Sequence, residues 1–185
     1  MKLKLTVKDA DKVLPEDRVL AEAAARGLEV LVRRHLRRKD SAAAHRAGFP
    51  KSGYWASAAE TVEAHAYRKT AVVEVGKEGA ALHYEGGTVR PKAGKKALAI
   101  PIDPSVATIW PSEHAGYATG GSGDDGATAV FWPRGSSHGF IKDTETGDLL
   151  WLLVPKATIR ADKTVLPSDE DLLGAAADAI WGCVE

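Results

Sequence analysis

The chain has 185 residues, of which 44% are apolar and 27% are charged, and these values are typical of one soluble globular domain, residues 1–185, with a core of its own. The 25 Lys and Arg residues balance the 25 Asp and Glu residues, so no net charge attracts the whole molecule to nucleic acid or to an anionic membrane. We therefore expect any charged partner to contact a local patch.

The first forty residues show a strand pattern followed by a helix pattern. Lys2 to Val7 alternates polar and apolar residues, which predicts a short strand. From about Pro15 to Arg38 apolar residues recur every three to four positions, which predicts a long helix. The acidic residues near the start of this helix and the arginines near its end suit the helix dipole.

A loop, a short helix and a hairpin are expected next. Asp40 to Lys51 contains Gly and Pro and is predicted to be a loop, after which Ser52 is a candidate cap for a short helix holding Tyr54 and Trp55. The runs 61–68 and 71–77 alternate in character and are separated by two polar residues. They predict a β-hairpin.

Leu82 to Pro101 is the most informative segment of the chain. It contains an apolar and aromatic run, a Gly86-Gly87 turn, a basic loop, and the alternating run 96–102, which predicts a strand. Pro91 restricts the backbone around the loop, so the positive charges have a defined shape. We expect a stiff basic hairpin arm that serves as a contact surface.

The second half of the chain is expected to contain a loop, a hairpin and a closing helix. Residues 103–126 contain two prolines and end in TGGSGDDG, which predicts a flexible insertion. The turn TETGD joins two strands, the second of which, LLWLLV, has no polar gap and is expected to be covered on both faces. Ser168 is predicted to cap a helix that is acidic at its start and ends near Trp181.

The order of these elements predicts an α+β domain built on an antiparallel sheet. The single cysteine, Cys183, excludes an internal disulfide and a multi-cysteine metal site. We therefore expect the protein to mature in a reducing compartment, or to fold independently of the redox state of its compartment. No apolar run reaches the length of a signal peptide or of the ~20 residues that a membrane span needs. We expect neither secretion by the usual route nor membrane insertion.

The patterns that carry catalytic chemistry are missing from the sequence. His138 adjoins two serines, but no strand-to-helix elbow of the G-x-S-x-G type surrounds them, so a polar loop is the better interpretation. Gly94-Lys95 is followed by another lysine and a strand, which excludes a Walker phosphate loop. The histidines lack the spacing of metal ligands: His35, His45, His65, His83, His114 and His138. We predict no enzymatic activity, no metal and no cofactor.

Two basic groups are candidates for subunit or DNA contact. One is a band near the end of the long helix, in which arginines are stacked one turn apart, and its alternative interpretation is a solvated helix end. The other is the basic loop, together with the aromatic side chain before the glycine turn. The candidate residues are Arg33, Arg34, Arg37, Arg38, Tyr84, Arg90, Lys92, Lys95 and Lys96. Trp110 and Trp181 are candidate docking residues, although burial in the core is the default for tryptophan.

Three blocks of the sequence, in this order, resemble the phage virion morphogenesis and tail-completion family of neck proteins. The first is HRAGFPKSGYWASAA, His45 to Ala59, and the second is LHYEGGTVRPKAGKKALAIP, Leu82 to Pro101. The third is LLWLLVPKATIRADKTVLPSDEDLLGAA, Leu149 to Ala177. Each block carries shape and composition more than chemistry, so the resemblance rests on their order. The middle, Asp103 to Asp148, is longer than the family usually needs.

The resemblance implies a small antiparallel β-sandwich or barrel-like sheet flanked by a long N-terminal helix and a C-terminal helix, as in tail terminators. It implies a structural virion protein, assembled in the bacterial host cytoplasm, that completes the tail and joins it to the head as part of a ring, expected to be a hexamer. Its partners would be head-completion or connector proteins and the tail terminator or tail tube protein, with non-specific DNA contact in the lumen. Acidic residues 169–171 of one subunit would pair with a basic group of the next.

Two alternatives to a neck protein stay open. The tail terminator itself is expected to have a similar fold, and position in the virion separates the two. A nucleic-acid-binding protein that uses the basic helix and loop belongs to another class, and strong, salt-dependent duplex binding would favour it.

Overall fold

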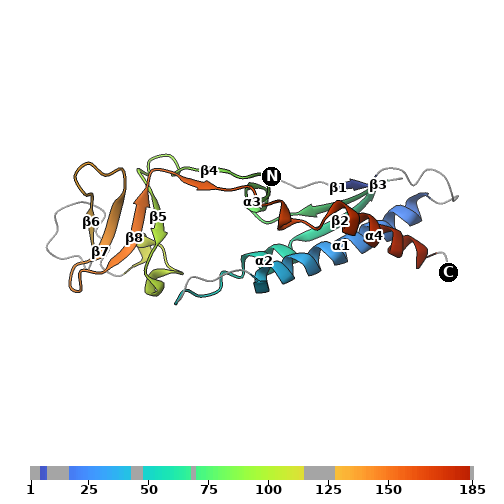
Figure 1. Ribbon diagram of the computed structural model, residues 1–185, viewed down its shortest axis with the longest axis horizontal. Coiled ribbons are helices and arrows are strands. Elements are labelled where there is room, and N and C mark those ends of the chain that lie inside the picture. Colours follow the sequence, from blue (N-terminus) through green and yellow to red (C-terminus); the bar gives the residue numbers. More distant parts are fainter. Residues whose placement is uncertain (1–4, 8–16, 43–47, 68–69, 115–127, 184–185) are drawn as a thin grey trace. The chain divides into compact units, whose positions relative to one another are not determined.

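The computed structural model describes residues 5–7, 17–42, 48–67, 70–114 and 128–183 (Figure 1). The chain divides into two compact units, whereas its length and composition predict one domain. Unit 1 comprises Met1–Ala44, Ser52–Gly87 and Arg160–Glu185, and unit 2 comprises His45–Lys51 and Thr88–Ile159. Each unit has a core of its own, because the buried apolar side chains fall into two separate clusters.

Unit 1 combines a three-stranded sheet with the two longest helices. The strands β1 (Leu5–Val7), β2 (Val62–Tyr67) and β3 (Thr70–Val75) pair antiparallel in the order β1-β3-β2. Helix α1 (Asp17–Ala42) packs against β2, β3, the short helix α2 (Tyr54–Glu60) and the C-terminal helix α4 (Asp169–Trp181). The remaining elements are α3 (Ala80–Glu85) and the 3-10 turn η3 (Lys163–Val165). The predicted hairpin is confirmed, with Val62 opposite Val75.

Helix α1 is buried along one stripe, as its apolar spacing predicts. Leu28 and Leu36 are fully buried and Val32 is nearly so, whereas the arginines of the same helix face outward or reach its edge. The helix continues to Ala42, beyond the predicted end at Arg38, and Pro15 lies outside the described residues. Gly27 allows α4 to approach closely, because a Cβ built there would lie 2.5 Å from the Ala175 carbonyl oxygen.

Unit 2 is built on a four-stranded antiparallel sheet. The strands β5 (Leu98–Pro101), β6 (Thr128–Phe131), β7 (Gly139–Asp143) and β8 (Leu149–Val154) lie in the order β5-β8-β7-β6. Strand β8 is central, and its residues Leu150, Trp151, Leu153 and Val154 are all less than a tenth exposed. Since consecutive side chains point to opposite faces, this confirms that the strand is covered on both sides.

A third, two-stranded sheet pairs β4 (Gly87–Val89) with β9 (Ala157–Ile159). Because β4 pairs with β9 whereas β5 pairs with β8, the basic segment between β4 and β5 connects two sheets. The expectation of a basic hairpin arm is therefore wrong. The described residues form a mixed α+β structure with a long N-terminal helix, a C-terminal helix and antiparallel sheets, and their strands close no barrel.

The segment predicted to be a flexible insertion is structured over its described part. Residues 103–114 form two 3-10 turns, η1 (Pro104–Val106) and η2 (Pro111–Glu113). The Asp103 carboxylate accepts a hydrogen bond from the Ser105 amide at 2.8 Å, and Val106 is buried in the core of unit 2. Residues 115–126, which include TGGSGDDG, lie outside the described residues.

Candidate contact surfaces

Four of the six arginines of α1 lie together, as their spacing predicts. Arg33, Arg34, Arg37 and Arg38 line an open hollow of about 540 Å³ with Val30 and Ser41. Residues three and four apart share one side of a helix, so the sequence brings all four guanidinium groups to one region. This arginine face belongs to unit 1.

Two of the four arginines are engaged within unit 1. Arg33 donates to the Val62 carbonyl oxygen at 2.9 Å and lies 2.8 Å from the Glu29 carboxylate. Arg37 donates to the Glu60 carboxylate at 2.8 Å, and this hydrogen bond lowers the pKa of Glu60 below its ordinary value. Arg33 and Arg37 therefore join α1 to the start of the hairpin and the end of α2.

Arg34 and Arg38 differ from the other two. Both are exposed, one helical turn apart, and neither guanidinium group has a polar partner among the residues that the structure describes. Their guanidinium donors thus face solvent at the hollow, and Arg37, which is itself exposed, adds charge beside them. A guanidinium group binds carboxylate and phosphate oxygens with paired donors, so the arrangement suits an anionic partner.

The basic loop belongs to unit 2 and is exposed throughout its charged positions. Arg90, Lys92, Lys95 and Lys96 all project from the link between β4 and β5, and within the described ranges none has a side-chain partner. A turn shapes the loop, because the Lys95 amide donates to the Lys92 carbonyl oxygen at 3.0 Å and Gly94 has a φ of 85°.

Tyr84 lies in α3, where it packs against the core of unit 1. The ammonium group of Lys163 lies 3.9 Å from the centre of its ring, within the range of a cation–π contact. Tyr84 is half-buried, whereas the charged residues of the basic loop are exposed. The sequence groups Tyr84 with that loop as a contact residue, but its side chain packs against the core of unit 1.

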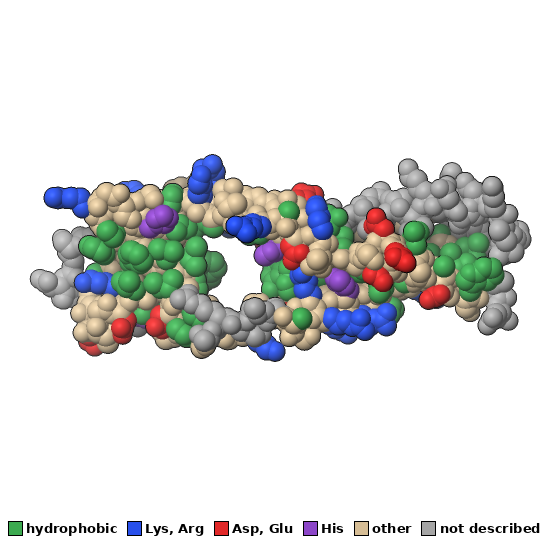
Figure 2. Space-filling model, viewed as in Figure 1, with side chains coloured by type: hydrophobic (Ala, Val, Ile, Leu, Met, Phe, Trp, Pro, Cys, Tyr) green, Lys and Arg blue, Asp and Glu red, His purple; other side chains and the backbone are tan. Residues whose placement is uncertain are grey.

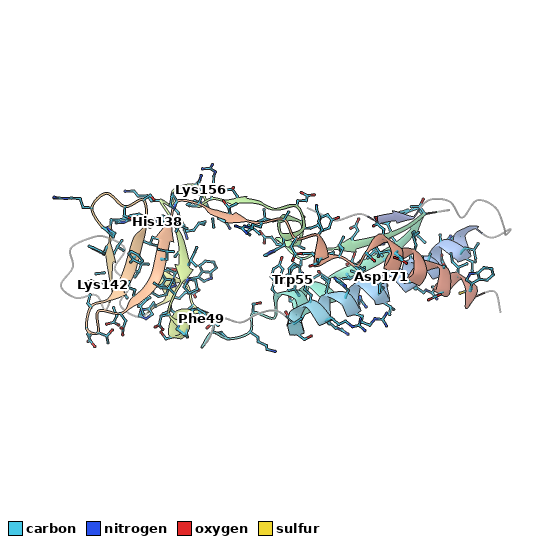
Figure 3. All side chains as sticks on the ribbon, in the orientation of Figure 1. Phe49, Trp55, His138, Lys142, Lys156 and Asp171 are labelled. Atoms are coloured by element: carbon cyan, nitrogen blue, oxygen red, sulfur yellow. The ribbon has the colours of Figure 1, made fainter. Side chains whose placement is uncertain are left out.

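An aromatic cluster that the sequence pattern did not predict joins α2 to α3. The rings of Tyr54 and Trp55 lie 4.8 Å apart, and each lies within about 5.3 Å of the His83 ring. Trp55 is labelled in Figure 3. Lys77 lies over the Tyr54 ring and Lys39 over the Trp55 ring. The pairs Tyr54-Trp55 and His83-Tyr84 were visible in the sequence, but 27 intervening residues gave no indication that they meet.

A polar network links the end of α1 to the segment before α4. Lys39 donates to the Asp162 carboxylate and to the Thr164 hydroxyl, both at 2.8 Å. The hydrogen bond from Lys39, followed by that from the Thr164 hydroxyl, lowers the pKa of Asp162 to about 2. A ring nitrogen of His35 lies 2.9 Å from the Thr164 carbonyl oxygen, which completes the contact.

The remaining sequence candidates lie apart from one another. Trp110 and Trp181 are 66% and 67% exposed, as docking residues would be. His138 is exposed in the loop between β6 and β7, where its ring nitrogen lies 3.2 Å from the Ser137 hydroxyl. Across the described residues, no three His, Cys, Asp or Glu side chains are grouped to hold a metal ion.

None of the described helices combines the length and the apolar character that a membrane crossing requires. Comparison of the chain with protein-family models, with curated proteins and with solved structures found no match.

Proposed function

We propose that this protein is a structural component of the bacteriophage head–tail neck, which completes or caps the tail and joins it to the head connector as part of a ring. The observation that carries the proposal is that a part of each of the three family-like blocks meets the other two within unit 1. Trp55 comes from the first block, His83 from the second and Asp162 from the third.

The contacts among the blocks are specific. The rings of Trp55 and His83 lie 5.2 Å apart, and the His83 carbonyl oxygen accepts a hydrogen bond from the Asp162 amide at 2.9 Å. The blocks are separated in the sequence by segments that belong largely to unit 2 or to the hairpin. Their convergence supports the interpretation that they are parts of one structural module, as a shared family fold requires.

The proposal includes a tail-terminator-like body. In it, the sheet β1-β3-β2, with α1 and α4, serves as the rigid wall of the ring. The exposed basic loop of unit 2 and the exposed guanidinium groups of Arg34 and Arg38 supply contacts to neighbouring subunits or to the genome. A ring needs heterologous contacts, in which each subunit offers two different surfaces, and the expected assembly is a hexamer.

The experiment that tests the neck role deletes the gene in the phage or prophage that encodes it and images the particles by electron microscopy. We expect full heads and separate tails, with joining restored by the wild-type gene supplied in trans. Normal virions in the deletion strain would refute the role. Labelling of the tagged protein in the virion distinguishes a neck position from that of the tail terminator.

A second candidate is a nucleic-acid-binding protein, which the arginine-lined hollow favours. The test compares duplex DNA binding by the double variant Arg34→Glu/Arg38→Glu with that of Arg18→Glu, which changes the charge elsewhere on α1. Arg18 is 82% exposed, so this control also changes charge at the surface of α1 and not in its core. If DNA is the partner, wild-type affinity falls steeply with salt, and only the double variant flattens that dependence. Equal affinity and equal salt dependence in the two variants would contradict DNA binding at the arginine-lined hollow.

A further inference from the structure

Six cationic residues of unit 2 come from three separate segments that contain no acidic residue. The segments are 86–102, 129–141 and 149–159, and each includes strand residues of the four-stranded sheet. All six cationic side chains are exposed. They are Arg90, Lys92, Lys95, Lys96, Arg134 and Lys156.

The strand register places two of these segments at one end of the sheet. Leu98, the first residue of β5, lies opposite Val154, the last residue of β8. Lys96 precedes β5 by two residues, and Lys156 follows β8 by two residues. Both positions therefore leave the sheet at the same end, where Figure 3 labels Lys156. The rest of the link between β4 and β5 leads into this end.

The third segment reaches the same end through the turn between β6 and β7. Gly139, the first residue of β7, lies opposite Leu153, so the turn 132–138 lies beside the end of β8. This turn carries Arg134, and His138 of the same turn is labelled in Figure 3. We call the six cationic residues the basic end of the sheet.

The acidic residues of the sheet and its turns lie at the opposite end, as Figure 2 shows within this unit: Asp103, Asp143, Glu145 and Asp148. From Leu98 to Asp103 the extended chain covers about 17 Å. This distance is about twice the Debye length of ~8 Å at physiological ionic strength, so salt screens the two ends from each other. The other described carboxylate of unit 2, that of Glu113, accepts a hydrogen bond from the Trp110 amide at 3.0 Å.

The charges of the basic end are not compensated inside the described part of the protein. None of its six side chains has an ion-pair or hydrogen-bond partner there. The arginine face of α1 differs, because Arg33 and Arg37 each lie 2.8 Å from a carboxylate of unit 1. The basic end is therefore the stronger local attractor for an anion.

The composition of the basic end suits a nucleic acid better than an acidic protein. Four of its six members are lysines, and lysine is depleted at protein interfaces, whereas a phosphate contact requires only a reachable Lys or Arg. Four strands span about 14 Å from the first to the last. One strand of a DNA duplex carries a phosphate about every 3.4 Å along the axis, so this end of the sheet can face about four phosphates.

We propose that the basic end of the unit 2 sheet binds the phosphate backbone of nucleic acid without reading its sequence. The inference deepens the proposed function, because it assigns the genome contact to unit 2 and not to the arginine face. Each of the three segments supplies at least one cation to the contact. Binding releases counterions from the phosphates, so the affinity falls as the salt concentration rises.

The test measures the binding of a short labelled DNA duplex of mixed sequence to the full chain, by fluorescence anisotropy at several salt concentrations. The single variants Lys96→Gln, Arg134→Gln and Lys156→Gln neutralise one cation in each segment, and a triple variant combines them. Lys142→Gln is the matched control, because Lys142 belongs to the same sheet but adjoins Asp143 at the acidic end. Circular dichroism verifies that each variant is folded.

We expect each single variant to reduce the slope of log affinity against log salt concentration by about 0.9, and the triple variant to reduce it by about 2.7. At physiological salt the triple variant should lose at least about tenfold in affinity, and the control should match wild type. A triple variant with the affinity and slope of wild type would overturn the inference. So would a wild-type protein that does not bind the duplex.

Two further measurements separate the alternatives. Wild-type protein that binds polyglutamate but not DNA, with this binding lost in the triple variant, would assign the basic end to an acidic protein and overturn the inference. Loss of DNA binding in Arg34→Glu/Arg38→Glu, with normal binding by the triple variant, would move the contact to the arginine face and overturn it equally. The neck role is decided separately by the deletion experiment, and it would stand even if the protein bound no DNA.

Discussion

The ammonium group of Lys39 lies 2.8 Å from the carboxylate of Asp162, although the two residues are 123 positions apart in the chain. Lys39 is near the end of α1, and Asp162 caps η3 by accepting a hydrogen bond from the Thr164 amide at 2.9 Å. The chain passes through all of unit 2 between these residues and returns to unit 1 at Arg160. This ion pair therefore fixes the returning segment to the first helix.

The stability of unit 1 should depend on the ionisation of Asp162. Its pKa in the folded protein is about 2, below its ordinary value of 3.8, so the carboxylate stabilises the fold above about pH 4 and ceases to do so as the pH falls towards 2. A difference of this size corresponds to roughly 2 kcal/mol. Because the Asp162 side chain is 42% exposed, solvent screening reduces the expected contribution to about 1 kcal/mol.

Asp162→Asn should accordingly lower the free energy of unfolding by about 1 kcal/mol at pH 6, and this difference from wild type should vanish near pH 2. Urea titrations at several pH values measure it. Asp178→Asn, an exposed change on α4 of the same unit, is the control. A difference that is independent of pH would show that the ion pair is not its source.

Gly27→Ala should destabilise the protein by about 1–2 kcal/mol, although alanine is the better helix former by about 1 kcal/mol. The added Cβ would lie 2.5 Å from the Ala175 carbonyl oxygen and 2.7 Å from the Ala179 Cβ, so α1 and α4 would have to separate. Gly174→Ala on α4 is the matched change, since no atom lies within 4 Å of a Cβ built at that position. Gly174→Ala should raise stability by up to about 1 kcal/mol. Thermal unfolding measures both variants, and a Gly27→Ala protein more stable than the Gly174→Ala protein would contradict the close packing of α1 and α4.

Trp55→Ala should lower the free energy of unfolding by roughly 2 kcal/mol, less than for a fully buried tryptophan because Trp55 is only half-buried. The change removes ring contacts to Tyr54 and His83 and the cation–π contact from Lys39. Denaturant unfolding followed by circular dichroism measures the loss. Trp110→Ala removes a 66% exposed ring and should change stability by less than about 0.5 kcal/mol; similar losses in both variants would argue against the cluster.

Ser168→Ala should destabilise α4 by about 1 kcal/mol, because the serine hydroxyl accepts a hydrogen bond from the Asp171 amide at the helix start. Ser168→Asp retains an acceptor at the cap and should recover part of this loss. Hydrogen exchange of the first-turn amides of α4 measures the effect locally. Unchanged exchange in the alanine variant would refute the capping role.

The elements that were predicted correctly are those whose signals are local. The apolar period of α1, the Ser168 cap of α4, the two alternating runs of the β2-β3 hairpin and the TETGD turn before β8 each lie within about two dozen consecutive residues. Such signals depend on the backbone propensities of consecutive residues and on the periodic spacing of apolar side chains. Both can be read from one segment without knowledge of its tertiary partners. The arginine face of α1 was likewise predictable, because one helix positions all of its members.

By itself, the amino-acid sequence determined these helices and hairpins and the grouping of four arginines on α1. Only the tertiary structure decided that β4 and β5 join different sheets, that two cores form, and that Trp55, His83 and Asp162 meet. The physical reason is that these features depend on contacts between residues far apart in the chain, such as Lys39 and Asp162. The partner in such a contact is selected by packing and by charge, and no local pattern encodes it.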